Sequence, residues 1–487
     1  MKPNEDALLP LPARIDWTDA AFSFGAEVFC RTGASLDART EALLAELWHN
    51  FSMNGSSLRV REGDALGPFQ LTVAAGKSTP EVPELPAGEE YSLSVTEAGA
   101  AVSAKDQNGM LRGFFTLLQL IRAQNLHPGQ EALAIPGVSI LDHPAVGFRC
   151  LHLCVFPETT LPFLHKVVRL AGLLKFSHVI LEFWGMLRYD CMAELSWPAA
   201  YTKDQIRPIL ADARSMGMEP IPMFNHLGHA SASRSSYGRH VVLDQNPRLA
   251  TLFEPDGWTW CLSNPETLEL LRAIRSELIE LFGEGGFFHI GCDEAYSFAT
   301  CDRCREGDSR RLLLEYLNGL AEELAKMGRR PIMWGDMLLD STAWPSPIIA
   351  VSRPDQRTHE ILDSLDRRIV IADWQYSIQD SKLPSTEHFM SKGFDVMPCP
   401  WDQEANIRAL GQGAAELEAF GFMPTTWHTL PEHIRLIPVS AEAGWCGRRK
   451  RSLHDGISTL SGSLQRKVFP ACSDYLAAGF RRLEVIE

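Results

Sequence analysis

The chain has 487 residues, 45% of them hydrophobic and 22% charged, a composition typical of a globular protein with a large core. Its formal net charge of −15 contains no long run of one sign, which argues against a nucleic-acid partner and suits a neutral ligand. No stretch approaches ~18 consecutive apolar residues, so we expect no membrane-spanning segment.

The N-terminus carries Glu5 and Asp6 and lacks the apolar centre of a signal peptide. We therefore expect a cytoplasmic protein, or an exported one whose leader is absent from this sequence. Eleven cysteines, an odd number scattered along a long chain, favour reduced thiols over a disulfide framework.

Residues 1–143 are predicted to form a small α+β domain. A helix at 35–52 and a second at 109–124 show the spacing of an amphipathic helix, and a Pro-rich stretch at 78–90 is typical of a loop. Strands with alternating polarity are expected at 56–62 and 69–75, with a hairpin from Tyr91 to Asp106. The junction with the next domain is expected between Pro136 and Pro144.

Residues 144–487 show a different rhythm, in which apolar runs alternate with helical stretches. Such runs are typical of parallel strands buried on both faces. Eight units favour a (β/α)8 TIM barrel over a doubly wound open sheet. The expected strands are 148–155, 178–184, 219–225, 287–294, 330–336, 368–374, 394–401 and 422–427.

The carboxyl ends of these strands are rich in aromatic, acidic and histidine side chains. Active sites of such barrels lie at this end, and indole rings with carboxylates suit a sugar, because rings stack on its C–H face while carboxylates bind hydroxyls. The candidates are Glu182, Trp184, Asn225, His226, His229, Asp293, Glu294, Trp334, Asp336, Asp373, Trp374, Tyr376, Trp401, Asp402, Trp427 and His428.

The strongest signal is the segment His289-Ile-Gly-Cys-Asp-Glu-Ala295, an apolar strand that runs into two adjacent carboxyls. Alternation along the strand would point His289, Gly291 and Asp293 into the barrel, and Glu294 would begin the loop. One carboxyl could then hold a proton while the other stabilises positive charge. A surface Asp-Glu pair and a metal-ligand pair are the alternatives; the preceding apolar strand argues against the first.

This segment resembles the H-x-G-x-D-E motif of the family 20 β-N-acetylhexosaminidases. Further matches follow in the same order along the chain, and the N-terminal part is similar to the small domain that precedes the family barrel. The further matches are Phe148-Arg149-Cys150 on the first strand, Asn225-His-Leu-Gly-His229 after the third, Asn264-Pro-Glu-Thr267, and the pocket tryptophans Trp334, Trp374 and Trp427.

The resemblance implies a substrate-assisted retaining mechanism, in which the 2-acetamido oxygen of the sugar attacks the anomeric carbon. It implies that Asp293 orients the acetamido group and that Glu294 is the general acid and base. By the same resemblance Arg149 binds sugar hydroxyls, His229 orients the pair and Tyr376 donates to the acetamido carbonyl. Trp401 and Asp336 are further candidates for substrate binding from their strand ends.

The chain departs from the family pattern at several positions, which affects sugar preference more than the core reaction. Asn225 replaces an Asp, Cys292 replaces a Gly, and Glu182-Phe-Trp184 replaces an Asp-Asp-Gln run. His428-Thr429 follows Trp427 where the family often has a Glu.

Two further interpretations stay open beside the hydrolase. One is a catalytically silent carbohydrate-binding barrel, and the other is a metal-dependent barrel enzyme, with His226, His229 and Asp293 as conceivable ligands. The reaction expected here requires no cofactor. Cys301 and Cys304 form a C-x-x-C pair, a spacing that can supply half of a structural zinc site; the sequence has no second such pair, so free thiols or a redox pair are favoured over zinc here. The basic run Arg448–Arg451 is expected to be a solvated surface.

Overall fold

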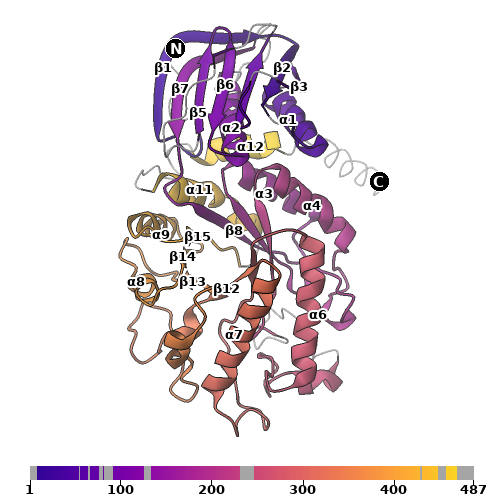
Figure 1. Cartoon of the computed structure of the whole chain (residues 1–487), viewed down its shortest axis with the longest axis vertical. Coiled ribbons are helices and arrows are strands. Elements are labelled where there is room, and N and C mark those ends of the chain that lie inside the picture. The colour runs from indigo at the N-terminus through magenta and orange to yellow at the C-terminus, as the bar shows by residue number, and fades with distance from the viewer. Residues whose placement is uncertain are drawn as a thin grey trace, which may run out of the picture.

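The structure is a computed structural model that describes residues 8–33, 35–53, 55–63, 66–75, 80–81, 91–124, 133–230, 246–427, 430–447 and 457–468. A β-sheet domain lies at one end of an elongated molecule and a barrel at the other (Figure 1). The expected loop at 78–90, His428-Thr429 and the basic run fall wholly or mostly outside the described residues.

The N-terminal part contains a seven-stranded sheet in the order β1-β7-β5-β6-β4-β2-β3, antiparallel except for the β2–β3 pair. Helix α2 contacts β5, β6 and β7, and α1 lies against α2 and β3. The predicted helices, strands and hairpin are present, but β1, β2 and β7 were not predicted. The elements are β1 Arg14–Phe24, β2 Glu27–Thr32, α1 Ala38–Phe51, β3 Ser57–Glu62, β4 Gln70–Ala74, β5 Tyr91–Thr96, β6 Gly99–Ala104, α2 Gln107–Gln124 and β7 Leu133–Asp142.

Pro136 lies inside β7. The junction between the two domains therefore does not begin at Pro136, as predicted, but after the end of β7. Proline is tolerated at position 136 because the strand register shifts between Trp17 and Ala21 of β1, opposite this part of β7. The seven-stranded sheet therefore continues to Asp142, and the first barrel strand begins at Phe148.

The eight predicted barrel strands are all present and form one parallel sheet in the order β14-β13-β12-β11-β10-β9-β8-β15. The ring closes where the amides of Met423 and Thr425 donate to the carbonyls of Pro398 and Pro400, at 3.1 and 2.9 Å. The strands are β8 Phe148–Cys154, β9 His178–Glu182, β10 Glu219–Met223, β11 Phe287–His289, β12 Arg330–Trp334, β13 Val370–Trp374, β14 Val396–Cys399 and β15 Gly421–Phe422.

Helices surround this ring and cover it from solvent, as the apolar runs require (Figure 1). Between β12 and β13 the connection contains the short 3-10 helix Thr358–Ser364 in place of a long α-helix. The helices are α3 Leu161–Leu173, α4 Lys203–Ser215, α6 Pro265–Phe282, α7 Ser309–Lys326, α8 Pro384–Ser391, α9 Glu404–Glu416, α10 Leu430–His433, α11 Ile437–Cys446 and α12 Ser458–Val468.

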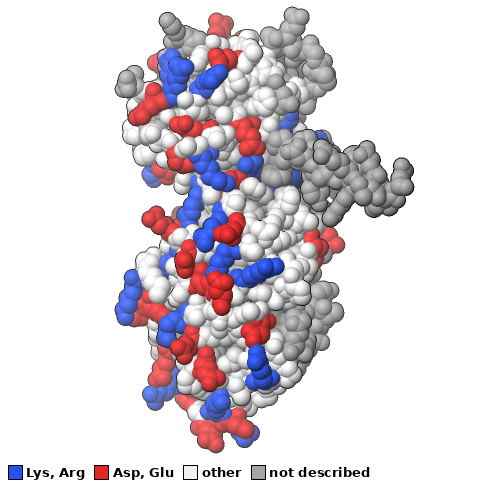
Figure 2. Space-filling model, turned by 90° about the vertical axis from the view of Figure 1, so that its right-hand side faces the viewer, with Lys and Arg blue, Asp and Glu red and all other residues white. Residues whose placement is uncertain are grey.

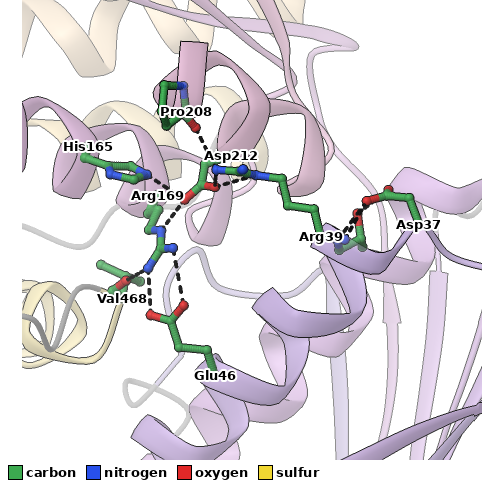
Figure 3. A network of polar contacts seen from close by, with 9 residues as sticks. Asp37, Arg39, Glu46, His165, Arg169, Pro208, Asp212 and Val468 are labelled. Atoms are coloured by element: carbon green, nitrogen blue, oxygen red, sulfur yellow. Dashed lines mark hydrogen bonds and ion pairs between the residues drawn. The ribbon is translucent and has the colours of Figure 1, made fainter. Parts of the chain in front are cut away.

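A network of charges joins the N-terminal helix α1 to the barrel helices α3 and α4 (Figure 3). The buried carboxylate of Asp212 accepts from Arg39, His165 and Arg169, and Arg169 also pairs with Glu46 at 2.7 Å. Burial alone would raise the pKa of Asp212, but hydrogen bonding by His165 and the charge of Arg169 outweigh it and lower that pKa. The two parts are therefore fastened by a fully partnered buried carboxylate.

The face seen in Figure 2 carries Lys and Arg side chains interspersed with Asp and Glu. A mixed surface of this kind creates no strong field toward a polyanion on that face. Within the described ranges, every helix is too short or too polar to cross a membrane.

Candidate active site

A cavity of about 270 Å³ opens at the carboxyl end of the barrel strands. Its volume is near the lower limit of ligand pockets, ~300 Å³. Seven side chains line it, and all were candidates from the sequence. They are His229, Asp293, Glu294, Trp374, Tyr376, Trp401 and Trp427.

The backbone that presents the two carboxyls differs from the predicted alternation. Strand β11 ends at His289, and Gly291, Cys292 and Glu294 then adopt positive φ angles of 65°, 72° and 48°. The two carboxyls are thus aimed by a strained turn, not by the pleat of a longer strand, which corrects the prediction. Such φ values are costly for non-glycine residues and are frequent at functional sites.

Two glycines permit the close packing of this turn. A Cβ on Gly291 would lie 1.9 Å from Oδ1 of Asn225, and a Cβ on Gly228 would lie 2.0 Å from the carbonyl oxygen of Asp293. Neither position can hold a side chain without displacing the turn. The space beside Gly291 is therefore filled by Asn225.

Asp293 and Glu294 converge on one histidine. Nε2 of His229 lies 2.9 Å from Oδ2 of Asp293 and 3.2 Å from Oε2 of Glu294. The Asp293 side chain is buried, and its Oδ1 has no hydrogen-bond partner among the described residues. Glu294 is more open, with 29% of its side chain exposed. The site thus pairs a buried acceptor with an accessible carboxyl.

Asp336 supports the pair from behind instead of lining the cavity. Its Oδ2 accepts from the amide of Glu294 at 2.9 Å, and its Oδ1 accepts from Nε1 of Trp374 at 3.0 Å. Burial raises the pKa of Asp336 to about 8, and the charge of Asp293 adds to the shift. Asp336 therefore fixes one pocket wall to the backbone of Glu294.

Aromatic rings form the rest of the pocket wall. The Tyr376 ring lies 5.0 Å from Trp374 and 5.3 Å from Trp401, and its hydroxyl accepts from Nε1 of Trp427 at 2.5 Å. Flat apolar faces beside carboxylates are the surface that a pyranose ring needs. Trp374 is the last residue of β13, and Tyr376, Trp401 and Trp427 come from the loops after β13, β14 and β15, as their positions at the strand ends predicted.

Trp334 lies below the pocket instead of in its wall. It is fully buried, and its ring packs 5.3 Å from Trp427, 4.5 Å from His289 and 5.7 Å from His152. As the last residue of β12 it still points into the barrel core. Its expected contact with substrate is therefore replaced by support of Trp427.

Arg149 lies at the opposite end of the barrel, so its expected role in binding sugar hydroxyls is wrong. It is the second residue of β8, and its guanidinium donates to the carbonyls of Val146 and Lys175, at 2.7 and 3.0 Å. The guanidinium also lies 4.8 Å from the Trp445 ring centroid. Arg149 thus holds the turn between α3 and β9 at Lys175, whose ammonium is buried against Asp142 of the N-terminal sheet at 2.7 Å.

Several other strand-end candidates serve the core. Glu182 accepts from Asn225 at 2.7 Å and contacts His152 at 3.1 Å, within the barrel. Asp373 accepts from Gln375, Ser385 and Thr386, away from the cavity. The ring of His226 is stacked near Phe288, so it does not join His229 and Asp293 as a third metal ligand.

Two contacts of Glu294 were not predicted. The hydroxyl of Tyr296 donates to Oε1 of Glu294 at 2.7 Å, and Nε1 of Trp258 donates to its carbonyl at 2.8 Å. The Trp258 ring also lies 4.3 Å from that of His229. Tyr296 directly follows the segment His289–Ala295, so the sequence could have pointed to it, whereas Trp258 lies in a loop that no predicted strand end indicates.

The C-x-x-C pair lies beside this site. Sγ of Cys261 is 3.5 Å from that of Cys301 and 3.7 Å from that of Cys304, and a carboxylate oxygen of Glu254 completes the group. The ten cysteines within the described ranges are all free thiols. Cys261 and Glu254 were not among the sequence candidates.

Comparison with protein families matches two successive regions of the chain. Residues 177–403 match the model "Glycosyl hydrolase family 20, catalytic domain", and residues 5–143 match "Glycosyl hydrolase family 20, domain 2". The matched regions include the described sheet and most of the barrel.

The curated relatives share about a quarter of their aligned residues with this chain. A β-hexosaminidase of Porphyromonas gingivalis is 25% identical over 369 residues, which cover 68% of this chain and 45% of that protein. A β-hexosaminidase of Akkermansia muciniphila is 26% identical over 292 residues, covering 53% of this chain and 57% of the relative. The chain thus spans about half the length of these relatives.

Solved structures share the fold over almost the whole chain. The N-acetyl-β-hexosaminidase of Streptomyces plicatus has a TM-score of 0.67 at 16% identity, covering 96% of this chain and 97% of its own. The Flavobacterium johnsoniae chitobiase has a TM-score of 0.70 at 17% identity, covering 95% of this chain and 73% of its own. At this identity the likeness shows a common architecture of barrel and preceding sheet domain.

Proposed function

The chain belongs to glycoside hydrolase family 20, and from this we propose that it is an exo-acting, retaining β-N-acetylhexosaminidase. Its substrates are glycans that end in β-linked GlcNAc or GalNAc. The small volume of the cavity supports the removal of a single terminal sugar.

One observation carries the proposal: the two carboxylates share the same histidine nitrogen, so they stand on one side of the site. In ordinary retaining enzymes the two carboxylates lie on opposite faces of the sugar, ~5–5.5 Å apart, and one attacks the anomeric carbon. Here the ligand atoms of His229, Asp293 and Glu294 all lie within 4.8 Å of one another. This arrangement favours a nucleophile that belongs to the substrate.

In the first step the acetamido oxygen bonds to the anomeric carbon while the glycosidic oxygen leaves with the proton of Glu294. The buried Oδ1 of Asp293 accepts the acetamido N–H, and the charge of Asp293 stabilises the oxazolinium ion. In the second step Glu294 takes a proton from water, which opens the oxazolinium ring at the anomeric carbon and restores the acetamide. Two displacements retain the configuration.

Tyr376 is our candidate for holding the acetamido carbonyl. Its hydroxyl oxygen accepts from Nε1 of Trp427, so the phenolic O–H is the group that would donate to the acetamido carbonyl. The pKa of Tyr376 is raised well above its usual value by burial, so the hydroxyl keeps that proton at neutral pH. The rings of Trp374, Trp401 and Trp427 support the sugar by stacking.

A screen of chromogenic substrates tests this function. We expect turnover of aryl β-GlcNAc or β-GalNAc and little turnover of the matched β-glucoside, because its 2-hydroxyl cannot form an oxazolinium. Aryl lacto-N-bioside belongs in the screen, because a lacto-N-biosidase of Bifidobacterium bifidum is 23% identical over 288 residues. Equal rates on the β-glucoside and β-N-acetylglucosaminide would refute substrate assistance.

The two alternative functions make different predictions. A silent carbohydrate-binding barrel would turn over none of these substrates. A metal-dependent enzyme that used His229, Asp293 and Glu294 as ligands would lose its catalytic activity as soon as EDTA removed the metal, and a divalent ion would restore that activity. We expect the initial rate to be unaffected by EDTA, because the proposed steps need only the two carboxylates and the substrate.

A further inference from the structure

Three cysteines and a glutamate form a compact group beside the active site. One ligand atom from each of Glu254, Cys261, Cys301 and Cys304 lies within 4.8 Å of the others. Cys261 and Cys304 are buried, as is Glu254 at 1% exposure. These residues come from two separate segments: Glu254 and Cys261 precede helix α6, and Cys301 and Cys304 follow the catalytic turn.

From this group we infer a structural zinc site with three thiolate ligands and one carboxylate ligand. Four ligands drawn from cysteine and acidic side chains suit the tetrahedral preference of zinc. Two sulfurs bound to one zinc at ~2.3 Å in tetrahedral geometry are about 3.8 Å apart. The observed separations from the Cys261 sulfur, 3.5 Å to Cys301 and 3.7 Å to Cys304, are close to this value.

The environment of Glu254 is a second, independent observation. Its Oε2 accepts from the amides of Thr300 and Cys301, at 3.0 and 2.7 Å. Its Oε1 is buried and has no hydrogen-bond partner among the described residues. A buried carboxylate oxygen without a donor is costly, and a bound cation would remove that cost.

The surrounding contacts suit metal-bound thiolates. The hydroxyl of Ser263 lies 3.2 Å from Sγ of Cys304 and can donate to a thiolate there. The amides of Cys304 and Arg305 both donate to the carbonyl of Cys301 at 3.0 Å, forming a tight turn that brings the C-x-x-C sulfurs to one side. Hydrogen bonds of this kind, made to a metal-binding side chain by its neighbours, hold that side chain in the orientation that the metal needs.

The site joins the two segments that flank the catalytic pair. Trp258, between Glu254 and Cys261, donates to the Glu294 carbonyl. Asp256 accepts from the hydroxyl of Ser297 at 2.5 Å, and Ser297 lies in the chain between the catalytic turn and Cys301. Zinc therefore holds the loop before α6 against the loop after β11, and it takes no part in the chemical steps.

Zinc content measured by mass spectrometry tests the assignment without any substrate, so it can fail independently of the proposed function. We expect wild-type protein purified under reducing conditions to retain one zinc per chain. Cys304→Ser should lose it. The matched control Cys191→Ser, at an exposed free thiol outside the group, should retain it. Glu254→Gln keeps an acceptor for the two amides and should release zinc more readily to a competing chelator.

Two measurements on wild-type protein serve if the cysteine variants fail to fold. Cobalt(II) added to the metal-free protein should produce thiolate-to-cobalt charge-transfer absorption. Removal of the metal should also speed tryptic cleavage at the exposed Arg303 and Arg305, which lie within and beside the C-x-x-C turn. Wild-type protein that neither contains zinc nor binds cobalt, or that holds a disulfide between Cys261 and Cys301 under reducing conditions, would overturn the assignment.

Discussion

Asp293→Asn tests the proposed electrostatic role of Asp293 most directly. The substitution keeps the shape of the side chain and one oxygen that can accept from His229, but it removes the negative charge. The oxazolinium charge would lie roughly 4 Å from this carboxylate. At an effective dielectric constant of ~20, a unit charge pair at ~4 Å contributes ~4 kcal/mol, which corresponds to a rate loss of ~10³-fold.

The assay is kcat/KM for an aryl β-N-acetylglucosaminide, measured with the affinity for a thiazoline analogue of the oxazolinium ion. Both should fall together, because the charge acts on the intermediate and the transition states that lead to it. Asp204→Asn, on helix α4 at a carboxylate with 92% of its side chain exposed, is the matched control and should keep both values. Circular dichroism would confirm that Asp293→Asn is folded.

A folded Asp293→Asn enzyme within tenfold of wild type would refute the electrostatic reasoning. A fluorosugar adduct on Asp293, found by mass spectrometry, would instead show that this carboxylate attacks the sugar. Inverted configuration in the first-formed product, measured by NMR, would exclude both double-displacement schemes.

Three further predictions concern the groups around Asp293. Glu294→Gln should lose ~10²–10⁴-fold on substrates with poor leaving groups and less on activated ones; equal losses would exclude the acid role. Tyr296→Phe removes the hydrogen bond to Glu294 Oε1 and so raises the pKa of Glu294, because the ionised carboxylate loses a donor; since Glu294 must be protonated to act as the acid, the alkaline limb of the kcat/KM pH profile should move to higher pH. The pKa of Asp336 is about 8 in the folded protein and ~3.9 in the unfolded chain, so the protonated carboxyl stabilises the fold. This contribution to the free energy of unfolding is lost as the pH rises from the lower value to the higher one. The melting temperature of Asp336→Asn should therefore depend less on pH over that range than the melting temperature of the wild-type protein. Parallel plots of melting temperature against pH for the two proteins would contradict the raised pKa of Asp336.

The sequence alone predicted the barrel strands and the place of Asp293 and Glu294 at the end of one of them, because both depend on local patterns. A strand buried on both faces needs a continuous apolar run, so eight such runs predicted the eight strands. Parallel strands place their carboxyl ends at one rim, which was enough to bring His229, Trp374 and Trp427 to the same pocket as Asp293. The strands β1, β2 and β7 were not predicted, and their place in the sheet depends on pairing between residues far apart in the chain.

Only the tertiary structure decided which candidates face the pocket. Arg149 stands at the amino end of its strand, and Trp334 still points into the barrel core, so a rule about strand ends could have excluded the first but not the second. The aim of Asp293 depends on positive φ angles after His289, which no alternation of residues encodes. Cys261 and Glu254 meet the C-x-x-C pair because two loops fold against each other, and side chains distant in sequence become neighbours only once both loops are packed.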